Sequence, residues 1–249
     1  MSSNSLEMPS PVSEMLIPTL NLMGFMTSWI DPYTEAFVKF APSAPGISLD
    51  IGAAYGVASL AVLETGTEVI VCDPDQRHLE ICAQRTPPTY KSRLRLLQGS
   101  LPNQINLEES SVGAILCSRV LHFLTGQQIE ESICNMFVWL RPGGRVYLIA
   151  DTPYNRFLKS FLPLYELRKL RGDVWPGQID NFPQFMPAEL APNLPKFFHT
   201  LDPDILARVC TQAGLIVEQT GFIARIDYLP DAQYDGREGV GIIAYKPES

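Results

Sequence analysis

The chain has 249 residues, of which 46% are hydrophobic and 18% are charged, and its formal net charge is −8 at pH 7. This length and composition suit one globular α/β domain of ordinary size, or one such domain with an insertion. The acidic balance excludes a broad nucleic-acid-binding surface, because such surfaces carry a basic face that neutralises phosphates, so no nucleic-acid partner is expected.

The first 46 residues are predicted to form a tail and a lid. Residues 1–13 are rich in Ser, Pro and Asn, which is typical of a disordered segment. One or two helices are predicted over roughly 14–40, within a helical lid at 14–46. The apolar stretch 15–30 has no Lys or Arg before it, which is unlike a secretory signal, and is predicted to cover an apolar cleft.

From residue 47, strands and helices alternate along the chain. Largely apolar strands in such an alternation predict a doubly wound α/β fold with a parallel sheet covered on both faces. The predicted strands lie at 46–52, 68–75, 93–99, 111–119 and 145–151, and the predicted helices at 56–64, 75–85 and 125–140.

Residues 152–199 interrupt the alternation. They are rich in proline and aromatic residues, and we predict a cap inserted between the fifth and sixth strands of a single domain, 14–249. The alternation resumes with a helix at 201–214, where Asp202 is the expected N-cap, and with strands at 215–223 and 239–247.

The five cysteines are widely scattered, and none forms a Cys-x-x-Cys pair. This pattern predicts free thiols and no metal site, and it favours a reducing, cytoplasmic compartment. No run of residues is long and apolar enough to be predicted as a transmembrane segment.

The loop after the first strand, Asp50–Gly56, bears on the kind of ligand. A dinucleotide-binding loop that starts at Gly52 would place its other two glycines where Ala54 and Val57 stand, so the match is poor. Instead, Asp50 stands two residues before Gly52. A carboxylate beside a helix N-terminus competes with a pyrophosphate and suits a cationic group such as an amine or a sulfonium.

A second acid, Asp73, closes the second strand, where an acid commonly accepts hydrogen bonds from ribose hydroxyls. Together with the Asp50–Gly56 loop, the segments LQGSL, ILCSRVLHFL and LRPGGRVYLIAD resemble the successive motifs of the class I S-adenosylmethionine-dependent methyltransferases. The resemblance covers roughly residues 47–151 and returns over 200–246. It implies a mostly parallel seven-stranded sheet whose last strand is antiparallel, with S-adenosylmethionine as the cofactor.

The resemblance also implies which residues bind that cofactor. Asp50 and Ser118 would lie near the methionine moiety, and Asp73 would bind the ribose. Ser100 would flank the adenine, where many members have an acid, which is a stronger acceptor. Tyr33 would contact the cofactor or merely pack the lid. The full set is Tyr33, Asp50, Gly52, Ala54, Gly56, Asp73, Pro74, Ser100, Leu101 and Ser118.

Methyl transfer from a sulfonium is a one-step displacement, in which a base can remove the proton of an oxygen or nitrogen acceptor. Asp151 and His122 follow the fifth and fourth strands, so they are the candidate bases, with a turn cap and helix-start packing as the structural alternatives. His199 is predicted to be structural or to contact the substrate, and His78 is expected to be exposed.

The cap is expected to select the substrate. Its aromatic residues would line an apolar pocket, bury the cap against the sheet, or do both; they are Tyr154, Phe157, Phe161, Tyr165, Trp175, Phe182 and Phe185. Segment 155–172 is predicted as a basic amphipathic helix that lies on an acidic partner or is simply solvated.

These features predict a methyltransferase that acts on a small or medium apolar metabolite, at oxygen. A protein or peptide substrate and a non-catalytic S-adenosylmethionine-binding protein of the same fold are the alternatives. An NAD-dependent oxidoreductase is disfavoured by the spacing of the glycines.

Overall fold

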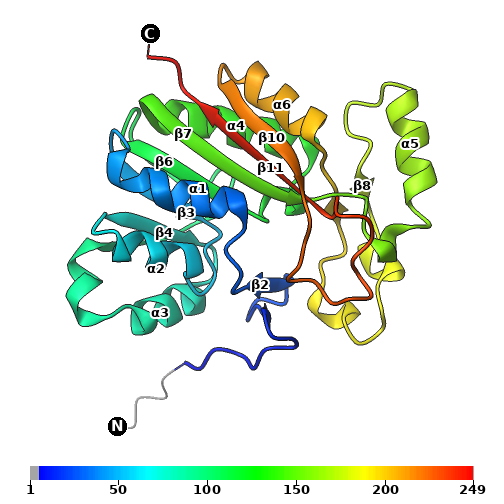
Figure 1. Cartoon of the computed structure of the whole chain (residues 1–249), viewed down its shortest axis with the longest axis horizontal. Helices are drawn as coiled ribbons and strands as arrows, with labels where there is room; N and C mark the ends of the chain where they lie inside the picture. Colours follow the sequence, from blue (N-terminus) through cyan, green and yellow to red (C-terminus); the bar gives the residue numbers. More distant parts are fainter. Residues whose placement is uncertain (1–5, 249) are drawn as a thin grey trace.

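The computed structural model describes residues 6–248, and its centre is a seven-stranded sheet in the order β10-β11-β7-β6-β3-β4-β5 (Figure 1). The strands are β3 (Ile47–Ile51), β4 (Val69–Asp73), β5 (Leu94–Gln98), β6 (Val112–Ser118), β7 (Leu140–Asp151), β10 (Ile216–Ile223) and β11 (Gly239–Tyr245). The last strand in the chain, β11, lies between β10 and β7 and runs antiparallel to both, whereas the other neighbouring strands are parallel. The predicted fold class, including the antiparallel last strand, is confirmed.

Helices cover both faces of the sheet, because the apolar side chains of each central strand alternate between two cores. In β6, Ala114 and Leu116 point into the core shared with α1, α2 and α3, whereas Ile115 and Cys117 point into the core shared with α4 and α6. The helices are α1 (Pro32–Phe40), α2 (Val57–Glu64), α3 (Gln76–Arg85), α4 (Gly126–Trp139) and α6 (Pro203–Gln212). Short 3₁₀ turns follow at η1 (Ala41–Ser43), η2 (Pro88–Arg93) and η3 (Leu121–Phe123).

The helix α6 begins as predicted. Asp202 Oδ1 accepts a hydrogen bond from the Ile205 amide at 2.9 Å, and Pro203 occupies the first helical position, where its missing N–H costs nothing.

The N-terminal region differs from the prediction of one or two helices over 14–40. Only α1 is helical, and a β-hairpin of β1 (Leu16–Pro18) and β2 (Phe25–Thr27) precedes it. Pro18 lacks an N–H for a helix, and Gly24 takes a φ of +114° that suits the turn of a hairpin. Residues 1–5 of the predicted disordered tail lie outside the described residues, and 6–13 contain no helix or strand.

The cap lies beyond the ends of the strands, on the right of Figure 1. It contains α5 (Leu162–Leu170), the antiparallel pair β8 (Gln178–Ile179) and β9 (Phe198–His199), and the 3₁₀ turns η4 (Arg156–Leu158), η5 (Phe182–Phe185) and η6 (Ala191–Asn193). It has a small core of its own, which consists of Tyr154, Leu158, Phe161, Tyr165, Ile179, Phe182 and Phe198.

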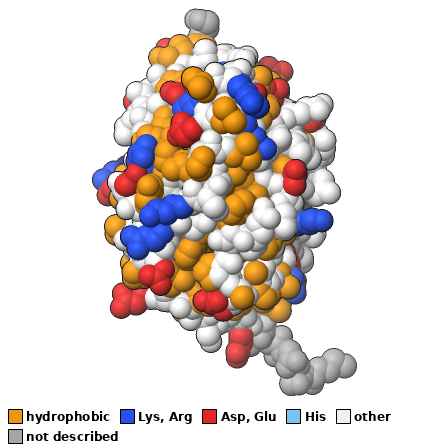
Figure 2. Space-filling view, turned by 90° about the vertical axis from the view of Figure 1, so that its right-hand side faces the viewer, with side chains coloured by type: hydrophobic (Ala, Val, Ile, Leu, Met, Phe, Trp, Pro, Cys, Tyr) orange, Lys and Arg blue, Asp and Glu red, His pale blue; other side chains and the backbone are white. Residues whose placement is uncertain are grey.

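The predicted single helix over 155–172 is wrong in extent, because only residues 162–170 are α-helical. Two of its cations bind other parts of this protein, one within the cap and one at the start of α6. Arg168 donates to the carbonyl oxygens of Pro176 and Gln178, and Lys169 pairs with Asp202 at 2.5 Å. Figure 2 shows this side of the molecule with hydrophobic, basic and acidic side chains intermixed. An acidic partner at this segment stays a prediction.

Candidate active site

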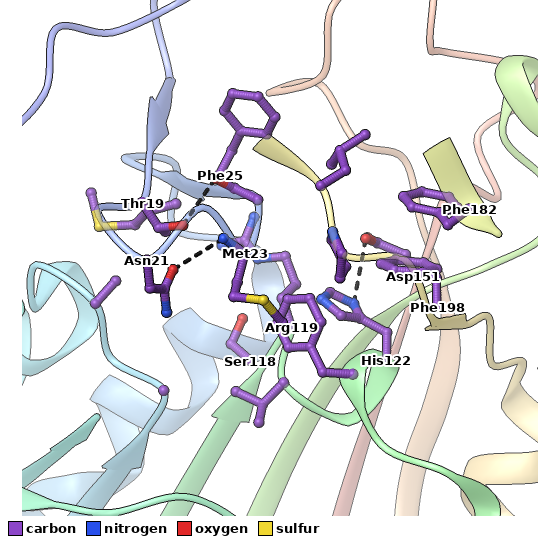
Figure 3. Close-up of a pocket in the computed structure, with 18 of the residues that line it drawn as sticks. Thr19, Asn21, Met23, Phe25, Ser118, Arg119, His122, Asp151, Phe182 and Phe198 are labelled. Carbon is purple, nitrogen blue, oxygen red and sulfur yellow. Dashed lines mark hydrogen bonds and ion pairs between the residues drawn. The ribbon is translucent and has the colours of Figure 1, made fainter. Parts of the chain in front are cut away.

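The carboxyl ends of the parallel strands converge on one cavity of about 420 Å³. Residues at or just after the ends of β3 to β7 line it, namely Gly52, Asp73, Gly99, Ser118 and Asp151. This is where an open parallel sheet places its ligands, because the loops that follow the strands diverge there. Figure 3 shows the hairpin residues on one side, Ser118 and Arg119 in the middle, and His122, Asp151 and Phe198 on the other side.

A smaller cavity of about 50 Å³ adjoins the first beside the Asp50–Gly56 loop. Asp50, Ala53 and the first turn of α2 line the smaller cavity alone, whereas Met26, Gly52, Ser118 and Arg119 line both. A ligand that extends from one cavity to the other therefore passes Gly52 and Ser118.

Asp73 is held by three hydrogen bonds. Its Oδ2 accepts from the Ala54 amide at 2.9 Å, and its Oδ1 accepts from the Asp75 amide and from His78 Nδ1, each at 2.9 Å. These donors fix the direction of the carboxylate at the edge of the cavity, where its free lone pairs can meet a ligand.

His78 is buried, and the expectation that it would be exposed is wrong. Its Nε2 accepts the Leu20 amide at 3.1 Å, while Nδ1 faces Asp73. The two contacts define the neutral tautomer with its proton on Nδ1. The imidazole is buried because the hairpin, which was not predicted, covers this turn of α3.

Asp50 and Gly52 line the smaller cavity, and the two glycines of this loop are also required by the close packing of the chain around them. Burial raises the pKa of Asp50 to about 6, and Ser59 donates a hydrogen bond to it at 2.5 Å. Gly52 has a φ of +69°, and a Cβ there would lie 2.2 Å from Val120. Gly56 has a φ of +78° and lies outside both cavities, where a Cβ would meet the Cys82 sulfur at 2.3 Å.

The remaining predicted cofactor residues divide into two groups. Ala54, Pro74, Ser100 and Leu101 line the main cavity, and Ser100 donates to Gln104 Oε1 at 2.8 Å. Tyr33 does not line it, because its ring packs on β11, where a Cβ at Gly241 would lie 2.2 Å from it. This position matches the packing alternative for Tyr33.

The two candidate bases lie side by side. His122 Nδ1 is 3.5 Å from Asp151 Oδ2 (Figure 3). The imidazole stacks on Phe198 with ring centroids 4.5 Å apart, and Phe198 stacks on Phe182 at 4.0 Å. Burial lowers the pKa of His122 to about 4, so the ring is neutral at pH 7.

Sequence reasoning missed the residues that orient Asp151. They belong to the segment between β10 and β11, for which no element was predicted. Arg225 Nη1 and the Tyr228 hydroxyl donate to Asp151 Oδ1 at 2.7 and 2.6 Å. Arg225 also forms a two-pronged pair with Asp227 at 2.8 and 2.7 Å. The clustering of Arg, Asp and Tyr directly after the sixth sheet strand was the available signal.

The cap supplies an apolar wall opposite the strand ends. Its members are Phe157, Leu158, Phe182, Met186, Leu190, Leu194, Pro195 and Phe198. The other predicted aromatic residues do not line the cavity; Trp175, for example, packs on His199 at a centroid distance of 5.1 Å. His199 is buried and does not line the cavity, and its Nδ1 lies 3.1 Å from the Leu124 carbonyl oxygen. This position fits a structural role for His199 better than contact with the substrate.

Within residues 6–248, no three His, Cys, Asp or Glu side chains gather in a way that could hold a metal ion. Over the same residues, every helix is too short or too polar to span a bilayer. Four of the cysteines are buried free thiols, and Cys134 is exposed.

Part of the chain is similar to known proteins. Residues 49–144 match the family model described as a methyltransferase domain. A demethylmenaquinone methyltransferase of Tropheryma whipplei is 31% identical over 117 residues, which are 47% of this chain and 46% of that protein. The chain thus spans about half the length of the curated relatives it matches.

Solved structures agree on the fold. An S-adenosylmethionine-dependent methyltransferase from Methanosarcina mazei superposes with a TM-score of 0.60 at 17% identity, over 81% of this chain and 92% of that one. The 1,6-didemethyltoxoflavin-N1-methyltransferase of Burkholderia thailandensis, solved with 1,6-didemethyltoxoflavin and S-adenosylhomocysteine bound, has a TM-score of 0.58 at 16% identity, over 87% of this chain and 79% of that one.

Proposed function

We propose that this chain, which contains a class I S-adenosylmethionine-dependent methyltransferase domain, transfers the methyl group to an oxygen atom of a small or medium apolar metabolite. The observation that carries the proposal is the His122–Asp151 pair. The pair lies in the main cavity. The strand ends on one side of this cavity suit the cofactor, and the apolar wall of the cap on the other side suits the acceptor.

The residues at the strand ends fit S-adenosylmethionine, which would supply an activated methyl group on a sulfonium. Asp73 offers carboxylate oxygens to the ribose, and Pro74 and Leu101 offer apolar surfaces to the adenine. The acids Asp50 and Asp73 lie beside the path between the two cavities and favour a positively charged ligand.

His122 is suited to accept a proton from a hydroxyl group. Asp151 faces Nδ1, so Nε2 is the nitrogen left to meet the acceptor. Arg225 and Tyr228 hold the Asp151 carboxylate in place, and the carboxylate can in turn stabilise the imidazolium that forms.

The low pKa of His122 also sets the order of events. A base with a pKa of about 4 cannot deprotonate a hydroxyl group in advance. Loss of the proton as the carbon–oxygen bond forms fits such a weak base, because the oxygen becomes strongly acidic only then. Phenolic and enolic hydroxyl groups, which are more acidic than aliphatic ones, fit this requirement best.

If the protein is a methyltransferase, the main alternative to a small metabolite is a protein or peptide substrate. The hairpin and the cap both overhang the cavity, and they contribute Phe25, Met26, Leu190 and Leu194 to its lining. Walls on two sides favour a molecule that fits inside over a segment of polypeptide that must pass through.

The proposal is tested in two stages. Isothermal titration calorimetry should show binding of S-adenosylhomocysteine and S-adenosylmethionine, and failure to bind either would overturn it. The protein is then incubated with S-adenosylmethionine and matched apolar phenols, anilines and thiols, with peptides as a separate panel. Mass spectrometry should find methylation at oxygen; transfer only to amines, thiols or peptides would contradict the acceptor, and binding without any turnover would favour the non-catalytic alternative.

A further inference from the structure

Arg119 occupies the junction of the two cavities, and no prediction from the sequence assigned it a role. It follows Ser118 at the end of β6 and lines both cavities (Figure 3). Among the described residues that line the smaller cavity, Arg119 is the only Lys or Arg, whereas Asp50 lines it too. Arg119 is therefore the side chain with which an anionic group in the smaller cavity would form an ion pair.

The side chain has hydrogen-bonding capacity to spare. The arginine side chain offers five N–H donors, and within residues 6–248 that of Arg119 donates one hydrogen bond, from Nη1 to Asp227 Oδ2 at a long 3.4 Å. Asp227 is already bound more tightly by Arg225, at 2.8 and 2.7 Å. The guanidinium is thus only weakly committed to the protein.

The backbone at Arg119 is strained, which is a second and independent sign of function. Its φ is +58°, in the left-handed region that residues other than Gly, Asn and Asp rarely adopt. The Arg119 amide donates to the Ile149 carbonyl oxygen at 2.7 Å, which ties this conformation to β7. Such strain is usually kept where a side chain must be placed for a ligand.

The first turn of α2 faces the same space. Val57 and Ala58 line the smaller cavity, and the N-cap residue Gly56 supplies no side-chain hydrogen bond to the helix. The uncapped amides add to the positive potential that Arg119 creates.

We infer that Arg119 binds the carboxylate of the methionine moiety of S-adenosylmethionine in the smaller cavity, an inference that rests on the proposed function. The carboxylate then lies between the guanidinium and the first turn of α2, and the amino group lies on the side of Asp50. The alternative, an acceptor carboxylate, would have to bind on the cap side of the main cavity, where the guanidinium of Arg225 is already paired with Asp151 and Asp227.

The test uses two ligands that differ only in this group, S-adenosylhomocysteine and its decarboxylated analogue. A charge-assisted pair with arginine predicts that the wild-type protein binds S-adenosylhomocysteine about 10- to 100-fold more tightly in calorimetry. In Arg119→Gly the preference should fall below about threefold, while affinity for the analogue stays constant. Arg119→Lys should retain part of the preference.

Two controls separate this role from a structural one. Arg119→Gly should melt no lower than the wild type, since glycine adopts a positive φ without strain. Arg95→Ala removes an exposed arginine that pairs with Glu68 outside both cavities, and it should leave the preference for the carboxylate unchanged.

The outcomes are distinguishable. If the wild-type protein binds neither ligand, the proposed function fails and the inference fails with it. If it binds both equally, or if folded Arg119→Gly keeps the full preference, the proposed function stands and the role of Arg119 is refuted.

Discussion

Acidification from pH 7 to pH 5 should destabilise the fold through two buried histidines. Burial lowers the pKa of both His122 and His199 to about 4, whereas an unfolded histidine titrates near 6.5. Between these values the unfolded chain binds more protons than the native chain, so the free energy of unfolding falls as the pH falls. Asp50 acts in the opposite direction, because its pKa is raised to about 6 by burial.

The size of the effect follows from these pKa values. From pH 7 to pH 5, each histidine removes about 2 kcal/mol of stability, and Asp50 restores about 1 kcal/mol. The net loss is about 2 to 3 kcal/mol, because the two histidines together remove slightly less than about 4 kcal/mol and Asp50 restores slightly more than about 1 kcal/mol. Paired carboxylates such as Asp202 and Asp227 have lowered pKa values and add to the loss only in more acidic solution.

The assay is urea denaturation of the wild type and of His199→Phe at both pH values, with unfolding monitored by circular dichroism. The phenylalanine keeps a ring beside Trp175 and Phe197 but cannot titrate. It also loses the contact of Nδ1 with the Leu124 carbonyl oxygen at every pH, so the readout is the difference between the two pH values. That difference should shrink to below about 1 kcal/mol. An unchanged difference, or a wild type that is more stable at pH 5, would refute the reasoning.

Three further substitutions test the site. Asp73→Asn should weaken binding of S-adenosylhomocysteine by about tenfold or more in calorimetry, because a neutral amide is a poorer acceptor for ribose hydroxyls; unchanged affinity would remove Asp73 from the site. Tyr33→Phe should change that affinity by less than about twofold, since its ring packs on Gly241, and a large loss would show that Tyr33 contacts the cofactor after all. His122→Gln should lower the rate of methyl transfer by about 10²- to 10⁴-fold with little effect on cofactor affinity, and a rate within a few-fold of the wild type would exclude His122 as the base.

The cofactor side of the site could be predicted because it depends on local pattern. Each parallel strand has a short apolar run that ends in a polar or small residue, and the carboxyl ends of such strands meet at one edge of the sheet. Asp73 was found in this way, whereas Ser100 and Ser118 were assigned by the resemblance of their segments to methyltransferase motifs, and all three line the cavity. Tyr33 was placed by its distance along the chain alone, which says nothing about which way its ring points.

The acceptor side could not be predicted, because it is assembled from segments without a regular period. The hairpin was mistaken for helix, since its apolar residues are too few to reveal a period of two. Arg225 and Tyr228 stand in a connection between antiparallel strands, and their target, Asp151, lies more than seventy positions earlier in the chain. Only the fold brings such residues together.

The buried position of His78 links the two sides physically. Its Nδ1 orients Asp73, the expected ribose ligand, and its Nε2 accepts the amide of Leu20 in the hairpin. The hairpin in turn contributes Thr19, Phe25 and other residues to the cavity lining. Loss of Asp73 would remove the acceptor that fixes the tautomer of His78. The orientation of Asp73 and the placement of the hairpin over the cavity therefore depend on the same imidazole, so a substitution in the hairpin is expected to affect Asp73, and the reverse.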